Sequence, residues 1–276
     1  MRLQMEYVIK PKSDLSLGLE ELWEFRELFF FFTWRDVKIK YKQAVLGIFW
    51  AILQPLFMTV IFSTLLGKAI NDQTHLPIPY PVFVLSGLLL WGIFSGGMTN
   101  AADSMIANAN IIKKIYFPRL IIPLSAVLAA CVDFLMALAI FFAMIVWYQV
   151  PVSGAGIWVI PLAVLQASVA AAGVGIFFAA LNVKYRDFRY IIPFLMQSLM
   201  FLTPVVYPVS IADNGVVQKL LQLNPMAGAL ELFRGVFRDY IINWETVGAS
   251  ALSCAVFFTV GIFYFRKAET HFADIA

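Results

Sequence analysis

The stretch LWEFRELFFFFTWRDVKIKYKQAVLGIFWAILQPLFMTVIFSTLL, residues 22–66, decides the fold because it joins two physically different segments without a break. From residue 44 onward it carries no charged side chain, over more than the ~20 residues that span a hydrocarbon core of ~30 Å. Its first half mixes charged side chains with Trp and Phe, which is typical of a helix lying in the membrane interface. We therefore expect an interfacial helix at about residues 19–42, rather than a basic flank that only orients the span, and a membrane span at about residues 44–67.

The composition of the whole chain is that of a membrane protein. It is 61% hydrophobic and 13% charged, with a mean hydropathy of +0.82, whereas soluble domains carry about 25% charged residues. The polar start of the chain and the missing cleavage-site pattern predict that no secretory signal is removed. Cys131 and Cys254 each lie in an apolar run, which predicts packing residues and neither a disulfide framework nor a metal site.

Further apolar runs predict five more spans, at about residues 80–102, 120–148, 157–181, 190–209 and 246–265. Residues 103–119 are expected to form a short helix at the membrane surface. Between the last two spans, residues 216–223 and 227–240 are amphipathic pieces shorter than the ~17 residues needed to cross. The expected fold class is an all-α integral membrane protein with six transmembrane helices, an N-terminal interfacial amphipathic helix and two short re-entrant helices, in a single transmembrane domain covering residues 1–276.

The distribution of basic residues predicts the orientation of these spans. With six spans and both termini in the cytosol, sixteen Lys and Arg residues lie inside and four outside, the bias that short inner loops show. In the second span, Gly92 and Gly96 have a spacing that lets membrane helices approach closely, although such a spacing is common by chance.

The chain has no pattern for catalysis or nucleotide binding. Gly67-Lys68 is not a phosphate loop, because Phe62 occupies the earlier Gly position and Ala69 the Ser/Thr position. Any ATP energy would therefore come from a separate subunit.

Two sets of charged residues admit more than one interpretation. Asp133 lies inside a span and could carry a proton, but no second ionisable group appears at that depth, so we favour a bond to a neighbouring helix. Glu231, Arg234 and Arg238 stand at helical spacings, which predict either a local ion pair or a site for an anionic ligand.

Six motifs resemble those of one family: the permease subunits of ABC transporters that export polysaccharides, of the Wzm, KpsM and TagG type. The likeness covers nearly the whole chain. The motifs are WRDVKIKYKQAVLGIFW (residues 34–50), QPL (54–56), NIIKKIYFPR (110–119), LNV (181–183) with Arg186 and Asp187, TPV (203–205) with Tyr207 and Pro208, and LNPM (223–226) with Arg234. The sequence departs from many relatives at Ala44, where Ser is common, and at Thr203-Pro204, where Ser-Pro is common.

The resemblance implies the transmembrane subunit of an ATP-driven exporter of lipid-linked polysaccharide, with O-antigen favoured and capsule or teichoic acid as alternatives. It implies a homodimer with two cytosolic ATPase subunits, in the bacterial cytoplasmic (inner) membrane. ATP and Mg would bind to the partner subunit. No cofactor is expected to bind to this chain. No nucleic acid is expected as a partner. Two other function classes stay open: an ion-coupled secondary transporter using Asp133, and a membrane enzyme acting on lipid-linked sugars. The chain itself is expected not to be an enzyme.

Three groups of residues are candidates for function. The resemblance implies that a surface segment fits a groove on the ATPase; its residues are Ile111, Ile112, Lys113, Lys114, Ile115, Tyr116 and Phe117. Cations able to bind the diphosphate of a lipid-linked glycan, or simply anionic lipid, are Arg35, Lys38, Lys40, Arg234 and Arg238. Aromatic faces able to line a sugar path, or simply to face lipid, are those of Trp50, Phe57, Trp91, Phe94, Phe201 and Tyr207.

Overall fold

The computed structural model describes residues 19–42, 49–74, 76–154, 156–185, 187–211 and 215–269. Within these ranges the chain is almost entirely helical, with one isolated antiparallel bridge between Val152 and Phe237. The helices are α1 (Leu19–Glu24), α2 (Arg26–Lys42), α3 (Phe49–Thr74), α4 (Tyr80–Ala107), α5 (Ala109–Ile112), α6 (Ile121–Trp147), α7 (Val159–Lys184), α8 (Phe188–Leu202), α9 (Val216–Gln222), α10 (Ala227–Arg234) and α11 (Trp244–Glu269). Short 3₁₀ turns lie at Gly156–Trp158 and Val209–Ile211.

Five helices are long and apolar enough to cross a membrane: α3, α4, α6, α7 with the 3₁₀ turn before it, and α11. The chain is therefore a multi-pass membrane protein, and the all-α prediction is confirmed. The predicted span at residues 120–148 is one residue longer at each end than the observed α6. The helix α4 begins at Tyr80, next to Pro79 and Pro81, because a proline ring fits the first turn of a helix.

Two of these helices continue past their apolar runs. The first span was predicted to end at about residue 67, but α3 stays helical to Thr74. Similarly, α4 extends five residues beyond the predicted end at residue 102. A helix satisfies its backbone hydrogen bonds internally, so polar side chains do not end it when they can project into water. The start of the first predicted span, before Phe49, lies outside the described residues.

The predicted fifth span, residues 190–209, is a shorter helix in the structure. At ~1.5 Å per residue, the 15 residues of α8 extend about 22 Å, less than the ~30 Å of a hydrocarbon core. The helix stops before Thr203, whose backbone is extended, because Pro204 disfavours a helical residue ahead of it. Long helices alone therefore do not give six crossings in the described part of the chain.

The region after α8 contains two short helices, as the sequence predicted. The first, α9, ends within a residue of its predicted end, whereas α10 stops at Arg234 and gives way to turns before residue 240. All eight residues of α10 are buried, and the helix packs against α7 and α11. Whether this pair re-enters the bilayer stays a prediction.

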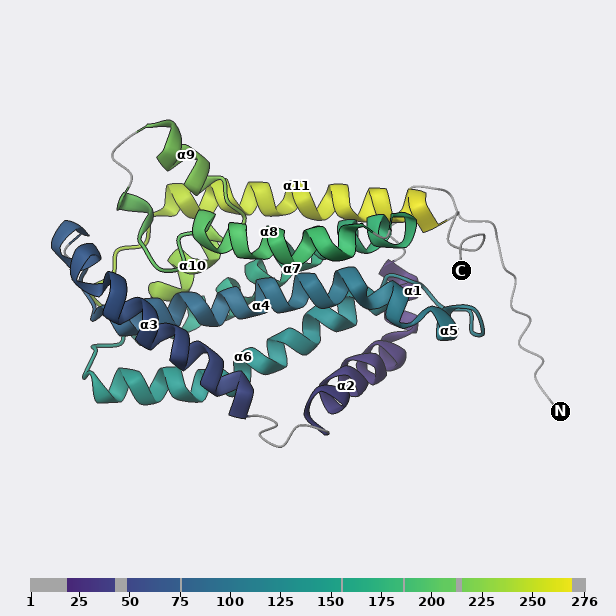
Figure 1. Cartoon of the computed structure of the whole chain (residues 1–276), viewed down its shortest axis with the longest axis horizontal. Helices are drawn as coiled ribbons and strands as arrows, with labels where there is room; N and C mark the ends of the chain where they lie inside the picture. Colours follow the sequence, from purple (N-terminus) through teal and green to yellow (C-terminus); the bar gives the residue numbers. More distant parts are fainter. Residues whose placement is uncertain are drawn as a thin grey trace.

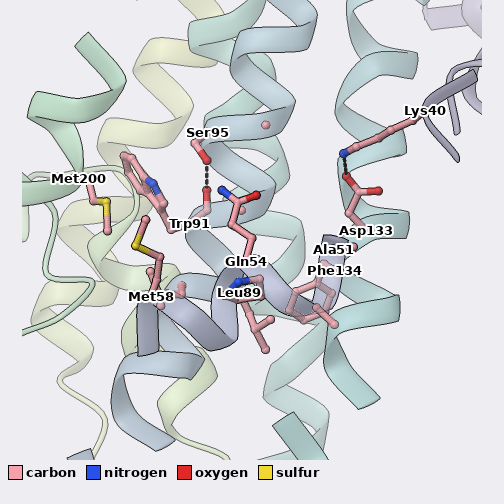
Figure 2. Close-up of a pocket in the computed structure, with 15 residues that line it drawn as sticks. Lys40, Ala51, Gln54, Met58, Leu89, Trp91, Ser95, Asp133, Phe134 and Met200 are labelled. Carbon is pink, nitrogen blue, oxygen red and sulfur yellow. Dashed lines mark hydrogen bonds and ion pairs between the residues drawn. The ribbon is translucent and has the colours of Figure 1, made fainter. Parts of the chain in front are cut away.

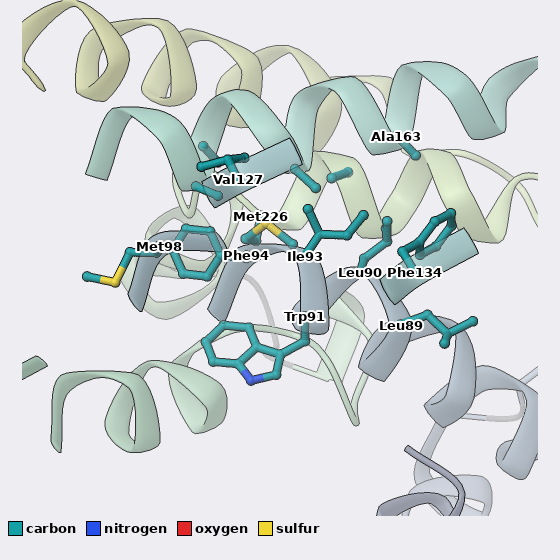
Figure 3. Close-up of a cluster of buried hydrophobic side chains, with 14 of the residues drawn as sticks. Leu89, Leu90, Trp91, Ile93, Phe94, Met98, Val127, Phe134, Ala163 and Met226 are labelled. Carbon is teal, nitrogen blue, oxygen red and sulfur yellow. The ribbon is translucent and has the colours of Figure 1, made fainter. Parts of the chain in front are cut away.

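The centre of the protein is α4. Of its apolar stretch, 78% is buried, compared with 6% for α3. It packs mainly against α6 and α7 (Figure 1). Figure 3 shows Ile93, Phe94 and Met98 of α4 beside side chains of α6 and α7, with Met226 of the region after α8 among them. Helix α3, in contrast, lies on the outside of the bundle.

A close backbone contact between two helices involves glycines other than Gly92 and Gly96. A Cβ added at Gly92 would meet nothing within 4 Å, and one at Gly96 would lie 3.9 Å from Ala130, so no described helix of this chain uses that spacing for a close approach. Instead α7 and α11 touch backbone to backbone, since a Cβ at Gly261 would lie 2.2 Å from the carbonyl oxygen of Gly173. Small residues permit such contact between membrane helices.

At one end of the bundle lie α2, α5 and the end of α11, whereas α9 lies at the opposite end (Figure 1). The helix α2 packs on α6 and buries Phe32 and Val37. Trp23 of α1 and Phe30 and Trp34 of α2 are exposed. A helix is thus present where the interfacial helix was expected, with Trp23, Phe30 and Trp34 exposed and Phe32 packed into the bundle. Its place in the membrane interface stays a prediction.

Candidate functional site

The surface segment expected to bind an ATPase lies between α4 and α6. Its first residues form the single turn of α5, and turns follow. Lys113, Lys114, Ile115 and Tyr116 are exposed, with Ile115 and Tyr116 at 60% and 72%. The segment thus offers two cations beside two apolar side chains on the surface.

Two contacts hold this segment in place. The ring of Phe117 is buried and lies 5.6 Å from that of Phe32 on α2. Arg119 donates from Nη1 to the carbonyl oxygen of Glu269 at the end of α11, at 2.9 Å. The segment is therefore in contact with α2, and Arg119, two residues after it, is in contact with the end of α11.

The three predicted cations of α2 have different surroundings. Arg35 is paired with the neighbouring Asp36 at 2.7 Å, and its guanidinium lies 4.7 Å from the centre of the Phe32 ring. Lys38 is exposed. Lys40 forms an ion pair with Asp133 of α6, ninety-three residues away in the sequence.

The prediction that Asp133 is bonded to a neighbouring helix is confirmed. Besides Lys40, its carboxylate accepts a hydrogen bond from the hydroxyl of Tyr41. Burial and the Asp133 carboxylate raise the pKa of the Tyr41 hydroxyl, so this hydroxyl stays protonated and can donate. The two donors compensate the carboxylate for lost hydration, and they tie the end of α2 to the middle of α6.

Two cavities adjoin this cluster. One, of about 270 Å³, lies between α3, α4, α6 and α8 and is lined by Gln54, Trp91, Ser95 and Met200 among others; we call it the inner cavity (Figure 2). The other, of about 720 Å³, lies between α2, α4 and α6 at the end of the bundle that carries α5; we call it the end cavity. The lining of the end cavity is mostly apolar, and Arg35, Asp36, Asp103, Asn108 and Asn110 are among its polar side chains.

The six candidate aromatic residues do not line one passage. Trp91 and Phe94 are buried, with ring centres 5.4 Å apart. The first lines the inner cavity and the second a separate apolar cavity of about 340 Å³ beside α7, α8 and α11. Trp50 and Phe57 are exposed on α3. Phe201 is exposed too, and its carbonyl oxygen accepts the Tyr207 hydroxyl at 2.7 Å.

Arg234 lies in the interior, so it is not placed to meet a headgroup from solvent. It is fully buried and donates to the carbonyl oxygens of Pro204 and Val205 at 3.1 and 2.7 Å. Its guanidinium lies 3.6 Å from the centre of the Phe83 ring of α4. It thereby holds the chain after α8 against α4.

Glu231 and Arg238, the other two charged residues at helical spacing with Arg234, differ in their exposure. Glu231 is buried and accepts the Tyr240 hydroxyl at 3.1 Å and the Asn243 amide at 3.4 Å. Burial raises the pKa of its carboxyl, although the Arg234 charge and these two donors oppose the rise. Arg238 follows α10 and is exposed. Of the three, Arg238 alone is available to a ligand from solvent.

Sequence reasoning missed the partners of these groups. It placed Asp133 beside an unidentified helix and gave Tyr41 no role. A signal was present, because an acid inside an apolar span needs a cation or donor, and the basic run that ends α2 is close in the chain to the first span. No sequence signal pointed to the carbonyl oxygens that Arg234 reaches.

Comparisons with known proteins agree with this architecture. Residues 27–237 match the family described as "ABC-2 type transporter". The chain is 30% identical to an O-antigen export system permease protein RfbA of Klebsiella pneumoniae, over all of both chains. It is 26% identical to an RfbA of Myxococcus xanthus, over 93% of this chain and 98% of that one. It is 25% identical to the polysialic acid transport protein KpsM of Escherichia coli, over 85% and 91%. The chain therefore belongs to the ABC-2 type transporter family of membrane proteins.

Proposed function

We propose that this chain is the transmembrane subunit of an ATP-driven exporter that moves a lipid-linked polysaccharide, O-antigen in the first place, across the bacterial cytoplasmic membrane. The observation that carries the proposal is the full-length similarity to a protein named as an O-antigen export permease. Relatives named for polysialic acid and capsule transport keep capsule as an alternative cargo.

The proposed assembly is two copies of this chain with two cytosolic ATPase subunits, which bind ATP and Mg. The exposed part of residues 111–117 supports an ATPase contact at that place, because Lys113 and Lys114 can meet acidic groups while Ile115 and Tyr116 can enter a groove. Its attachment to α2 and α11 offers a route by which a rigid-body movement of the ATPase reaches the membrane helices.

We further propose six crossings with both termini in the cytosol. Five are the long helices, and the remaining one combines α8 with the residues after it, up to about residue 209. The position of α2, α5 and the end of α11 at one end of the bundle supports this arrangement (Figure 1), since an even number of crossings returns the chain to its starting side.

The lipid-linked substrate is proposed to meet the cations of α2. Lys38 and Lys40 are exposed and Arg35 lines the end cavity; phosphate oxygens bind such groups strongly. Arg238 is the corresponding candidate at the far end. Trp91 in the inner cavity and the exposed rings of Trp50 and Phe57 are the candidates for contact with sugar rings.

Purification and reconstitution test this function. The tagged chain, extracted from its native membrane in mild detergent, should retain an ATPase subunit. The complex in liposomes should hydrolyse ATP faster when the lipid-linked glycan of the same organism is added, and should move that glycan across the bilayer. A chain that retains no ATPase, or a complex indifferent to the glycolipid, would contradict the proposal.

A further inference from the structure

The inner cavity and the end cavity share two lining residues, Lys40 and Asp133. These two side chains form the ion pair between α2 and α6, and Tyr41 adds its hydroxyl to the same carboxylate. Figure 2 shows the Lys40 side chain reaching from α2 to Asp133 at the edge of the inner cavity. The pair therefore stands where a passage between the two cavities would run.

This contact is of a kind that can open. The side chain of Lys40 is 53% exposed, so water and dissolved ions reach the ammonium group, and partly exposed ion pairs are weak. If Lys40 leaves, the Tyr41 hydroxyl still donates to Asp133, so the carboxylate keeps a partner. The open state is thus spared the cost of an uncompensated charge inside the helix bundle.

A phosphate group is the ligand that suits this exchange. It carries more negative charge than a carboxylate and offers several acceptor oxygens, so it binds an ammonium group at least as well. Arg35 and Lys40 line the end cavity together with the carboxylates of Asp36, Asp103 and Asp133, so an arriving phosphate meets two cations that already have carboxylate partners and must exchange with one of these partners. On the other side of the Lys40–Asp133 pair, the amide of Gln54, the hydroxyl of Ser95 and the ring of Trp91 line the inner cavity, where they can contact sugar rings once the pair has opened.

We infer that Lys40, Tyr41 and Asp133 form a latch that closes the passage between the end cavity and the inner cavity, and that a phosphate group entering the end cavity opens it by taking Lys40 from Asp133. The inference rests on the proposed function for one source of the phosphate, the lipid carrier of the glycan. Headgroups of the surrounding bilayer are the other source.

Labelling of a cysteine in the inner cavity tests the latch. Ser95→Cys places a thiol there, on a chain in which Cys131→Ser and Cys254→Ala remove the two native thiols. The complex with its ATPase is held in phosphatidylcholine nanodiscs, and a charged maleimide is added. Asp133→Asn and Lys40→Gln should each raise the labelling rate about fivefold, the shift that corresponds to about 1 kcal/mol. The exchange Lys40→Asp with Asp133→Lys should lower it again.

The matched control is the other ion pair of α2. Arg35 and Asp36 line the end cavity alone and belong to one helix, so Asp36→Asn should leave the labelling rate unchanged. Equal rates in Asp133→Asn and the parent, or an equal rise in Asp36→Asn, would overturn the latch.

The trigger is tested with defined lipids in the same nanodiscs. Polyprenyl diphosphate should accelerate labelling of the parent about as much as the Asp133→Asn substitution does. It should not accelerate labelling of the Asp133→Asn variant further. Polyprenol, which has no phosphate, should have no effect. Equal acceleration by phosphatidylglycerol, which unlike phosphatidylcholine has a net negative charge, would assign the trigger to anionic bilayer headgroups, and no effect of either polyprenyl diphosphate or phosphatidylglycerol would overturn it. These outcomes are separable from a failure of the proposed function, which would appear as a lost ATPase or as glycolipid-independent ATP hydrolysis.

Discussion

The two ends of the bundle hold charged groups in opposite ways. At the end with α2, the ion pairs of Lys40 with Asp133 and of Arg119 with Glu269 involve side chains that are at least partly exposed. At the far end, Arg234 is fully buried and bonded to two backbone carbonyl oxygens and an aromatic face. Water can replace the first kind of contact but not the second. The comparison indicates a far end that is fixed and a near end that can rearrange.

Replacement of the buried arginine should have the largest effect on stability. Arg234→Ala leaves the carbonyl oxygens of Pro204 and Val205 buried without donors, which costs about 1–3 kcal/mol each, and removes the contact with the Phe83 ring. Thermal unfolding of the purified protein in detergent should show a large fall in Tm. Arg238→Ala, at an exposed position, is the control and should change stability by less than about 0.5 kcal/mol. Equal Tm values for the two variants would remove the distinction between the ends.

A methyl group beside the same arginine should have the next largest effect. A Cβ at Gly87 would lie 2.3 Å from the Val205 carbonyl oxygen and 3.0 Å from Arg234 Nη2. Gly87→Ala should therefore destabilise the protein by about 1–3 kcal/mol through overpacking, measured by the same unfolding assay. Gly92→Ala in the same helix meets nothing within 4 Å and should cause no loss. A tolerated Gly87→Ala would show that the chain after α8 can shift away from α4.

The ion pair of the near end should contribute less. Asp133→Asn removes the Lys40 pair but keeps an acceptor for the Tyr41 hydroxyl, so we expect a loss of about 0.2–1 kcal/mol. Unfolding at low and high salt should show that the difference from the parent shrinks as salt screens the pair. A loss as large as that of Arg234→Ala would mean that Asp133 is a fixed structural residue.

The exposed cations should have the smallest effect on stability and a large one on assembly. Lys113→Glu with Lys114→Glu alters surface residues and should change stability by less than about 0.5 kcal/mol. The same variant should lose association with the ATPase in co-purification, because its charges would repel acidic groups of the partner. Retained association, also when Tyr116→Ala is added, would place the contact elsewhere.

The sequence predicted helices better than contacts. Apolar length reports membrane thickness directly, so the start of α4 and both ends of α6 were located closely. The ends of α3 and α4 were missed because polar residues can extend a helix into water. Gly92 was chosen for its spacing, yet the close contact is made by Gly173 and Gly261. The spacing of glycines shows where a second helix could approach closely, but the packing of the whole bundle decides at which glycines it does.

The candidate site was predicted in part. Local composition predicted a helix at α2 and the cations after α5. The expectation that Asp133 is bonded rather than free was also made from the sequence. Arg234 was named among the cations able to bind a diphosphate, and its complete burial was not predicted. A long side chain can reach groups far away in the sequence, and no pattern in one sequence shows which carbonyl oxygens it will meet.

The glycine contact between α7 and α11 has a consequence for how the protein can move. With the carbonyl of Gly173 directly against Gly261, no side chain lies between the two backbones at that level to change rotamer. Sliding or tilting one helix would bring backbone atoms into collision, since packed interiors resist continuous deformation. We therefore expect the two helices to move together, with hinges at their flanks, in the turn before α7 and in the chain between α10 and α11.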